Sequence, residues 1–164
     1  MNTTLLVGLL FGALGLIAQD DHHTTVDKRG DHVMGFSHEK TIHHFRLYAD
    51  GGAIEVTAND AKDTESRDQI RMHLSHLAVM FAAGNFQAPM LIHGQVAPGV
   101  PTLERLRAEV SYRFEGIPDG GLVRIATKNK EALSAIHEFL KFQISDHRTG
   151  DILDLTKETV KRLD

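Results

Sequence analysis

A short pattern that occurs twice constrains the fold of this 164-residue chain more than any other feature. The tripeptide Asp50-Gly51-Gly52 recurs as Asp119-Gly120-Gly121, and each copy lies between two runs in which apolar and polar residues alternate. Alternation on both sides of Asp-Gly predicts a β-hairpin, because glycine supplies the positive φ that a tight turn requires. The four runs are 41–48, 53–58, 110–115 and 122–127.

A helical pattern follows each hairpin. Asp63 or Thr64 can begin the first helix and Asn129 the second, because short polar side chains cap exposed backbone N–H groups. Gly84 and Gly150 stand where C-terminal glycines are common. Apolar residues recur at three- and four-residue intervals within each segment, at Ile70, Leu74, Leu77 and Phe81 and again at Leu133, Ile136, Leu140 and Ile144.

Two consecutive β-β-α units predict an α+β fold. Neither unit can bury its apolar face alone, so we expect one four-stranded antiparallel sheet with both helices on one face. The expected inner face carries Phe45, Leu47, Ile54, Val56, Tyr112, Phe114, Val123 and Ile125. The expected outer face carries His44, Arg46, Glu55, Arg113, Glu115 and Arg124. We interpret that charged face as a solvated surface with cross-strand ion pairs, and a homodimer interface is the alternative.

The start of the chain indicates export. Residues 5–17 are apolar apart from three glycines, a run shorter than the roughly 20 residues that span a bilayer. We therefore predict a secretory signal over 1–18 and a periplasmic or secreted protein with no stable membrane insertion after cleavage. A flexible N-terminal arm (19–30), the duplicated domain (31–150) and a tail (151–164) are expected to follow. The domain comprises repeats over about 41–84 and 109–150, with a Gly- and Pro-rich connection at 85–108.

Composition excludes several functions. The chain has 18 Lys and Arg against 22 Asp and Glu and no basic block, so we expect no nucleic-acid binding. It has no cysteine, which removes disulfides, thiolate catalysis and zinc fingers. It contains no phosphate-binding loop and no Gly-x-Ser-x-Gly nucleophile motif, so the sequence gives no specific sign of an enzyme.

Histidine and methionine carry the candidate chemistry, with 11 His and 5 Met in the chain. His73, His76 and Met80 fall on one side of the first predicted helix, beside its apolar stripe. Imidazole binds copper in either oxidation state, and thioether sulfur favours Cu(I). The alternative is that Met80 is a core residue and the two histidines border the core.

Two further clusters flank that helix in sequence. Met34 and His38 lead into the first strand, where His43 is expected to point towards the helices in line with Phe45. Met90 and His93 lie in the long connection. Each cluster also has a simpler interpretation: a hydrogen-bonded core His43, and a Met90 that fills a gap beside an exposed His93. In the second predicted helix, His137 is most simply a hydrogen-bonded core residue, and His147 lies near the C-terminal end.

The recurrence of these donors in one half of the chain favours a metal site. We expect copper to bind to ligands from His73, His76, Met80 and His93, supported by His38, His43, Met34 and Met90. Heme with a His or His/Met axial pair is a variant of the same site. The alternatives are a non-catalytic interaction module that uses the outer sheet face or the long connection, and a small enzyme with an acid–base histidine.

The runs 31–47, 71–76 and 85–93 resemble a family of small exported bacterial proteins of unknown role. Such chains are sometimes labelled aspartate carbamoyltransferases. The residues do not support that label, because the Ser-x-Arg-Thr phosphate motif has only a longer counterpart at 145–149, at a predicted helix end that repels phosphate. The β-β-α duplication is also similar in topology to the envelope copper chaperones of nitrous-oxide reductase maturation, which implies an expectation about the fold alone.

Overall fold

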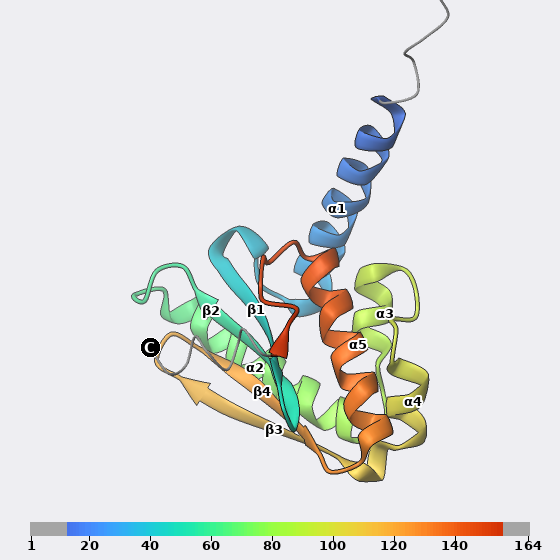
Figure 1. The fold of residues 1–164 in the computed structure, drawn as a ribbon. Coiled ribbons are helices and arrows are strands. Elements are labelled where there is room, and N and C mark those ends of the chain that lie inside the picture. The colour runs from blue at the N-terminus through green and yellow to red at the C-terminus, as the bar shows by residue number, and fades with distance from the viewer. Residues whose placement is uncertain (1–12, 156–164) are drawn as a thin grey trace, which may run out of the picture.

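The computed structural model describes the backbone of residues 13–155 and the side chains from Thr24 to Leu155. Four antiparallel strands form one sheet in the order β1-β2-β4-β3 (Figure 1). The strands are β1 (Thr41–Tyr48), β2 (Gly51–Ala58), β3 (Val110–Ile117) and β4 (Gly120–Thr127). The predicted α+β fold with a single four-stranded antiparallel sheet is confirmed.

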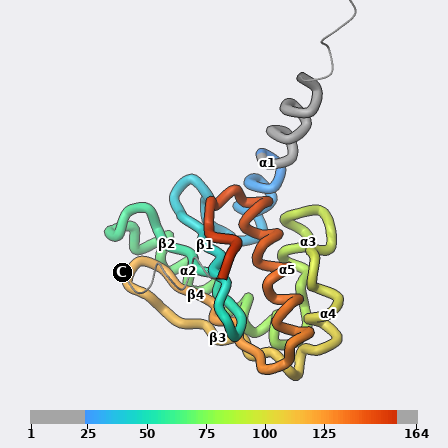
Figure 2. Tube along the Cα trace, in the orientation of Figure 1, coloured from blue at the N-terminus to red at the C-terminus, as the bar shows by residue number. Residues whose placement is uncertain are grey.

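Each repeat contributes one hairpin, and the second strands of the two hairpins pair at the centre of the sheet (Figure 2). Tyr48 pairs with Gly51 and Ile117 with Gly120, so a two-residue connection closes each hairpin and a glycine begins each return strand. A Cβ atom at Gly120 would lie 2.0 Å from the carbonyl oxygen of Val56. Glycine is therefore required where β4 approaches β2, as well as near the turn.

The two long helices begin where the capping residues predict. In α2 (Thr64–Ala82), the Asp63 side chain accepts a hydrogen bond from the Ser66 N–H at 3.0 Å. In α5 (Lys130–Asp146), the Asn129 side chain accepts from two backbone N–H groups of the first turn. The C-terminal ends of the two helices differ in the residue that adopts the left-handed conformation. After α2 this residue is Gly84, with a φ of 78°, whereas after α5 it is Arg148, with a φ of 51°, two residues before Gly150.

Both long helices pack against the sheet, α2 mainly on β3 and β4 and α5 mainly on β1 and β2. His137 of α5 also fixes the first hairpin, because its Nε2 lies 3.0 Å from the carbonyl oxygens of Tyr48 and Gly51. This contact agrees with the interpretation of His137 as a hydrogen-bonded core residue.

The inner face of the sheet matches the predicted pattern. Tyr112 and Phe114 are half-buried because they lie on the edge strand β3, and the other six predicted residues are fully buried. On the outer face, Arg46 binds Glu55 at 3.1 Å, and Arg124 binds Asp50 while lying over the Tyr48 ring. These pairings agree with the interpretation of a solvated outer face.

A helix precedes the sheet. The segment 19–30, predicted as a flexible arm, forms part of α1 (Ala13–Met34), which is followed by the short 3-10 helix η1 (His38–Lys40). Val26, Gly30 and Met34 lie one turn apart, and Val26 and Gly30 are buried. α1 also contacts α3. In the part of α1 whose side chains are described, a narrow stripe of small and apolar residues therefore docks the helix, with Val33 beside it, and the surrounding polar residues obscured the helical period.

The connection at 85–108 contains regular structure. It forms α3 (Gln87–His93), α4 (Val100–Arg105) and the 3-10 helix η2 (Arg107–Glu109). Gly94 ends α3 and Gly99 precedes α4, both with left-handed φ, and Pro101 lies in the first turn of α4. The glycines and prolines that suggested a loop therefore mark the ends of short helices.

The beginning of the predicted tail covers the edge of the sheet. Asp151 accepts hydrogen bonds from the Phe45 N–H at 2.9 Å and from Thr149 at 2.7 Å, and its other oxygen lies 2.8 Å from His44 Nδ1. β1 is an edge strand, and the N–H groups on its unpaired side would otherwise face solvent. The carboxylate of Asp151 thus ties the segment that follows α5 to the first strand.

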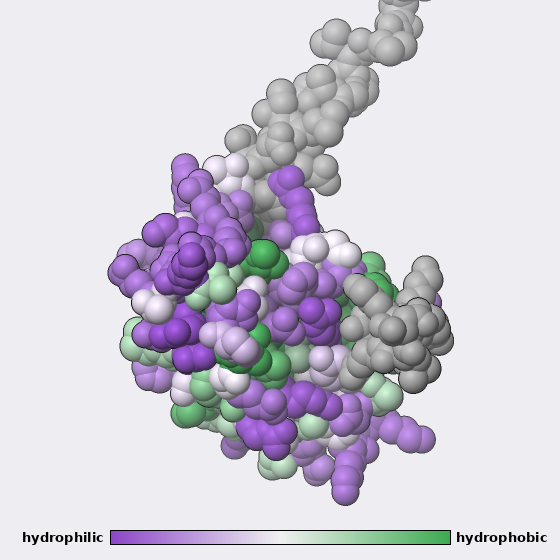
Figure 3. All heavy atoms as spheres, turned by 90° about the vertical axis from the view of Figure 1, so that its left-hand side faces the viewer, coloured by the Kyte–Doolittle hydropathy of each residue, from purple (hydrophilic) through white to green (hydrophobic). Residues whose placement is uncertain are grey.

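Residues 1–12 of the predicted signal and 156–164 of the tail lie outside the described residues. Within 13–155, no helix combines the length and apolar character needed to cross a membrane. On the side of the molecule seen in Figure 3, hydrophilic side chains cover most of the coloured surface and apolar ones form small, separate spots.

Candidate functional site

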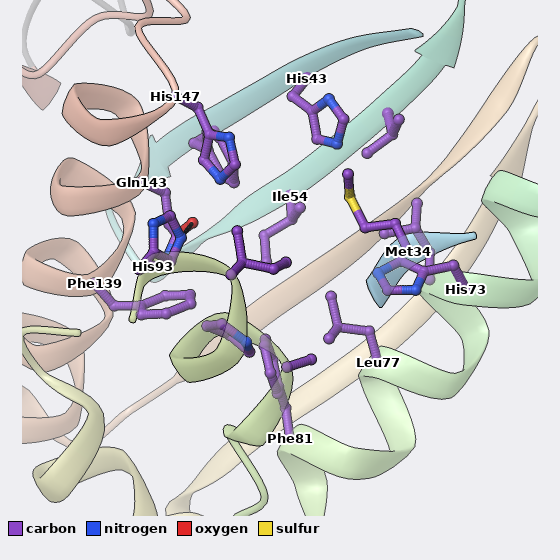
Figure 4. Close-up of a pocket in the computed structure, with 16 residues that line it drawn as sticks. Met34, His43, Ile54, His73, Leu77, Phe81, His93, Phe139, Gln143 and His147 are labelled. Atoms are coloured by element: carbon purple, nitrogen blue, oxygen red, sulfur yellow. Dashed lines mark hydrogen bonds between the residues drawn. The ribbon is translucent and has the colours of Figure 1, made fainter. Parts of the chain in front are cut away.

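A small cavity of about 50 Å³ lies between the sheet, α2, α3 and α5 (Figure 4). Most of its wall is apolar and comes from the inner face of the sheet and from the helices packed on it. Six polar or sulfur-bearing side chains interrupt that wall: Met34, His43, His73, His93, Gln143 and His147. The cavity therefore brings together residues from α1, β1, α2, α3 and α5.

His43 points inward from β1, as the strand alternation predicts. Burial lowers the pKa of His43 to about 4, and the nearby imidazoles of His73, His38 and His44 add to this effect, with Asp31 opposing it. The ring is consequently neutral at pH 7. Its Nε2 is buried without a hydrogen-bond partner. A buried nitrogen left in this state costs about 1–3 kcal/mol, so the fold retains it at the expense of stability.

Met34 and His73 lie next to His43. The Phe36 ring contacts both imidazoles, with its centroid 6.1 Å from that of His43 and 5.7 Å from that of His73. Figure 4 shows the Met34 side chain reaching between the two rings. Burial lowers the pKa of His73 to about 4, assisted by the nearby His76. Two neutral imidazoles and one thioether therefore line the same part of the cavity.

His93 lies across the cavity on α3 and is held on both ring nitrogens. Its Nδ1 is 2.5 Å from a carboxylate oxygen of Asp146, and its Nε2 is 2.9 Å from Oε1 of Gln143. The Gln143 amide nitrogen is buried without a hydrogen-bond partner. Reversing that amide would let its NH₂ group donate to a neutral His93 ring, because amide oxygen and nitrogen are assigned from their hydrogen bonds. In either orientation, His93 is a fixed residue of the wall with no free ring nitrogen.

The His147 ring contacts both His43 and His93, which lie on opposite sides of the cavity. It stacks parallel to the His43 ring with centroids 5.8 Å apart, and it meets His93 edge-on at 5.0 Å. The ligands predicted from the sequence all lie before the second repeat, so His147 and Gln143 were not among them. The sequence predicts that Gln143 and His147 lie near the C-terminal end of α5. It does not predict that this end faces the cavity, because that depends on how the two repeats pack against each other.

A second hollow, of about 320 Å³, adjoins the cavity beside α1. Met34, His43 and His147 border both spaces, whereas His38 borders the outer one. Nδ1 of His38 lies 2.9 Å from Asp31. The hydrogen bond and charge of Asp31 raise the pKa of His38 although burial, the largest influence, opposes them. His38 is thus already engaged with an acid at this surface.

The remaining predicted residues lie farther out. His76 is exposed and Met80 half-buried, and both border a third hollow, of about 310 Å³, together with His73. Met90 is 39% exposed on α3 while His93 is 3% exposed. This reverses the simpler interpretation of that pair, in which Met90 fills the core and His93 faces solvent. Met90 lines none of these three spaces.

The described residues contain no group of three His, Asp or Glu side chains arranged to hold a metal ion. A metal ion in the cavity would therefore need a thioether ligand besides the imidazoles. Met34 is the methionine that borders the cavity beside His43 and His73. The part of the cavity around Met34, where His43 and His73 lie, consequently offers two imidazole nitrogens and one sulfur.

Neither a family model nor a curated protein nor a solved structure matches this chain. The function of the cavity therefore has to be inferred from its own side chains.

Proposed function

We propose that this protein binds one copper(I) ion in the buried cavity, held by Met34, His43 and His73. The observation that carries the proposal is the buried Nε2 of His43, which has no hydrogen-bond partner and belongs to a ring lining the same cavity as Met34 and His73. A metal ion would give that nitrogen a partner and would offset the cost of burying it.

The chemistry of the donors supports copper(I) over a divalent ion. Thioether sulfur is a soft ligand that prefers Cu(I), and neutral imidazole binds it well. Both imidazoles are neutral at pH 7 because burial lowers the pKa of each to about 4. The cost of burying an ion grows with the square of its charge, so a monovalent ion suits an apolar wall better than a divalent ion does.

The size of the cavity supports a single ion rather than a heme group. About 50 Å³ accommodates an ion or a few water molecules. Pockets that enclose organic ligands have volumes of roughly 300–1,000 Å³. The copper version of the proposal therefore needs little rearrangement of the core, whereas a porphyrin would displace the packed side chains around it.

The surrounding residues suit a binding role more than a catalytic one. Acid–base catalysis by His93, the histidine paired with Asp146, would need its Nε2 free, but Gln143 occupies that nitrogen. We propose that this network stiffens the wall opposite the ligands. Together with the secretory signal predicted at the start of the chain, the site suggests a copper-binding protein of the cell envelope or the secreted fraction.

Copper titration of the purified full chain tests the proposal. With Cu(I) presented against a competing chelator under reducing conditions, we expect one equivalent to bind. The double variant His43→Leu/His73→Leu should lose affinity by more than about 100-fold, because loss of an outer partner alone costs 10–100-fold at metal sites. His32→Gln, which removes an exposed imidazole, is the matched control and should bind like the native chain. Failure of the native protein to bind Cu(I), or native affinity in the double variant, would overturn the proposal.

A further inference from the structure

Helix α2 carries a second set of copper-type donors on the outer side of the cavity. His76 and Met80 border the 310 Å³ hollow formed mainly by α2 and α3, and they are four residues apart on one helix face. His76 is exposed, so this hollow is open to ions from solvent. The proposed copper(I) site does not use either side chain.

His73 connects this hollow to the buried cavity. It borders both spaces, and so do Leu77 and Ala88. On the helix, His73 lies three residues before His76, a spacing that puts the two imidazoles on neighbouring positions of the same face. One side chain of α2 can therefore contact an ion on either side of the wall.

We propose that copper(I) passes in and out of the cavity through this hollow, with His76 and Met80 as the outer ligands and His73 as the ligand shared by both positions. The inference rests on the proposed copper(I) site and adds the path by which the ion reaches it. A bare ion crossing an apolar wall would lose its solvation without compensation, at a cost of several kcal/mol. Exchange of one ligand at a time avoids that cost, because His73 stays bound while His76 and Met80 leave and His43 and Met34 replace them.

The other hollow beside the cavity is the competing path. It also borders His43, Met34 and His147, but it adds no second thioether, and its remaining polar side chains are Asp27, His38 and two threonines. Carboxylate and hydroxyl oxygens are poor ligands for a soft ion. His38 is in addition hydrogen-bonded to Asp31 at 2.9 Å. The donors therefore favour the path along α2.

The test measures rates and affinity separately. Copper(I) is presented to the full chain as its coloured bicinchoninate complex, and the loss of colour is followed by stopped flow. The double variant His76→Gln/Met80→Leu removes both outer donors while keeping similar side-chain volumes at each position. We expect its uptake and release rates to fall together by about tenfold, which corresponds to about 1.4 kcal/mol in the barrier, with an unchanged dissociation constant.

His38→Gln is the matched control, because it removes an imidazole from the competing hollow, and it should keep native rates. Native rates in His76→Gln/Met80→Leu would overturn the path along α2. Slowing confined to His38→Gln would assign passage to the other hollow. A weaker dissociation constant with unchanged uptake in the double variant would make His76 or Met80 a ligand of the stored ion, which also overturns the inference. If the native chain takes up no copper(I), the proposed function itself fails, so the two failures are distinguishable.

Discussion

The unpartnered His43 gives the metal-free protein a specific sensitivity to acid. The pKa of its ring is about 4 in the folded protein against 6.5 for a free side chain, mainly because of burial. As the pH falls, the unfolded chain takes up this proton first, so stability is present above pH 6.5 and is progressively lost between about pH 7 and pH 4. The linkage between protonation and folding then predicts that the free energy of unfolding falls by about 2 kcal/mol between pH 7 and pH 5, given these two pKa values.

His73 has a similar lowered pKa and contributes a similar amount, so the native chain should lose about 4 kcal/mol over that interval from the two rings together. The substitution His43→Leu removes one of them and should halve the loss. At pH 7 the variant should be at least as stable as the native chain, because a buried nitrogen without a partner has been removed.

Urea unfolding at pH 7, 6 and 5, in the presence of a metal chelator, measures these differences. His32→Gln, which removes an exposed imidazole outside the cavity, is the control and should have the native stability at pH 7. A native pH dependence in His43→Leu would refute the reasoning, since it would mean that the ring is accessible to protons in the folded state.

Two further predictions concern the contacts that hold the cavity in place. Asp151→Ala should destabilise the fold by about 2 kcal/mol or more, because the backbone N–H of Phe45 and the His44 ring lose a charged partner at the sheet edge. Urea unfolding measures the loss, and a change below about 0.5 kcal/mol would contradict the role given to this carboxylate. His137→Phe should cost about 1–3 kcal/mol, because two carbonyls of the first hairpin lose their shared donor. Thermal unfolding would show this, and a melting temperature equal to the native value would argue that water replaces the ring.

The sheet could be predicted because its signals are local. Alternation on both sides of Asp-Gly specifies strands and hairpins, and the capping side chains of Asp63 and Asn129 mark helix starts with no contribution from distant residues. α1 was harder to predict because its apolar stripe is short and its docking surface on α3 belongs to another part of the chain. Gly94 and Gly99 suggested a loop because a left-handed glycine is equally suited to a turn and to a helix end.

In the candidate site, too, the features that depend on neighbouring residues could be predicted, and those that depend on the packing of distant segments could not. Strand alternation predicted that His43 points inward, and helical spacing predicted that His73 lies near the core boundary. The arrangement of His147 against His43 depends on how α5 crosses the first repeat, which no sequence spacing encodes. Met90 and Met34 looked equivalent in the sequence. The fold distinguishes the two methionines, because Met34 lines the cavity whereas Met90 is exposed.

X-ray absorption at the copper edge of the Cu(I)-loaded protein tests the ligand set most directly. We predict one sulfur and two imidazole nitrogens around the ion in the native chain and in Met90→Leu, the matched control in which an exposed thioether is lost. In Met34→Leu, which keeps a similar apolar volume, the sulfur signal should disappear. A nitrogen- or oxygen-only environment in the native protein, or a sulfur signal that persists in Met34→Leu, would contradict the assignment of the buried cavity as the copper(I) site.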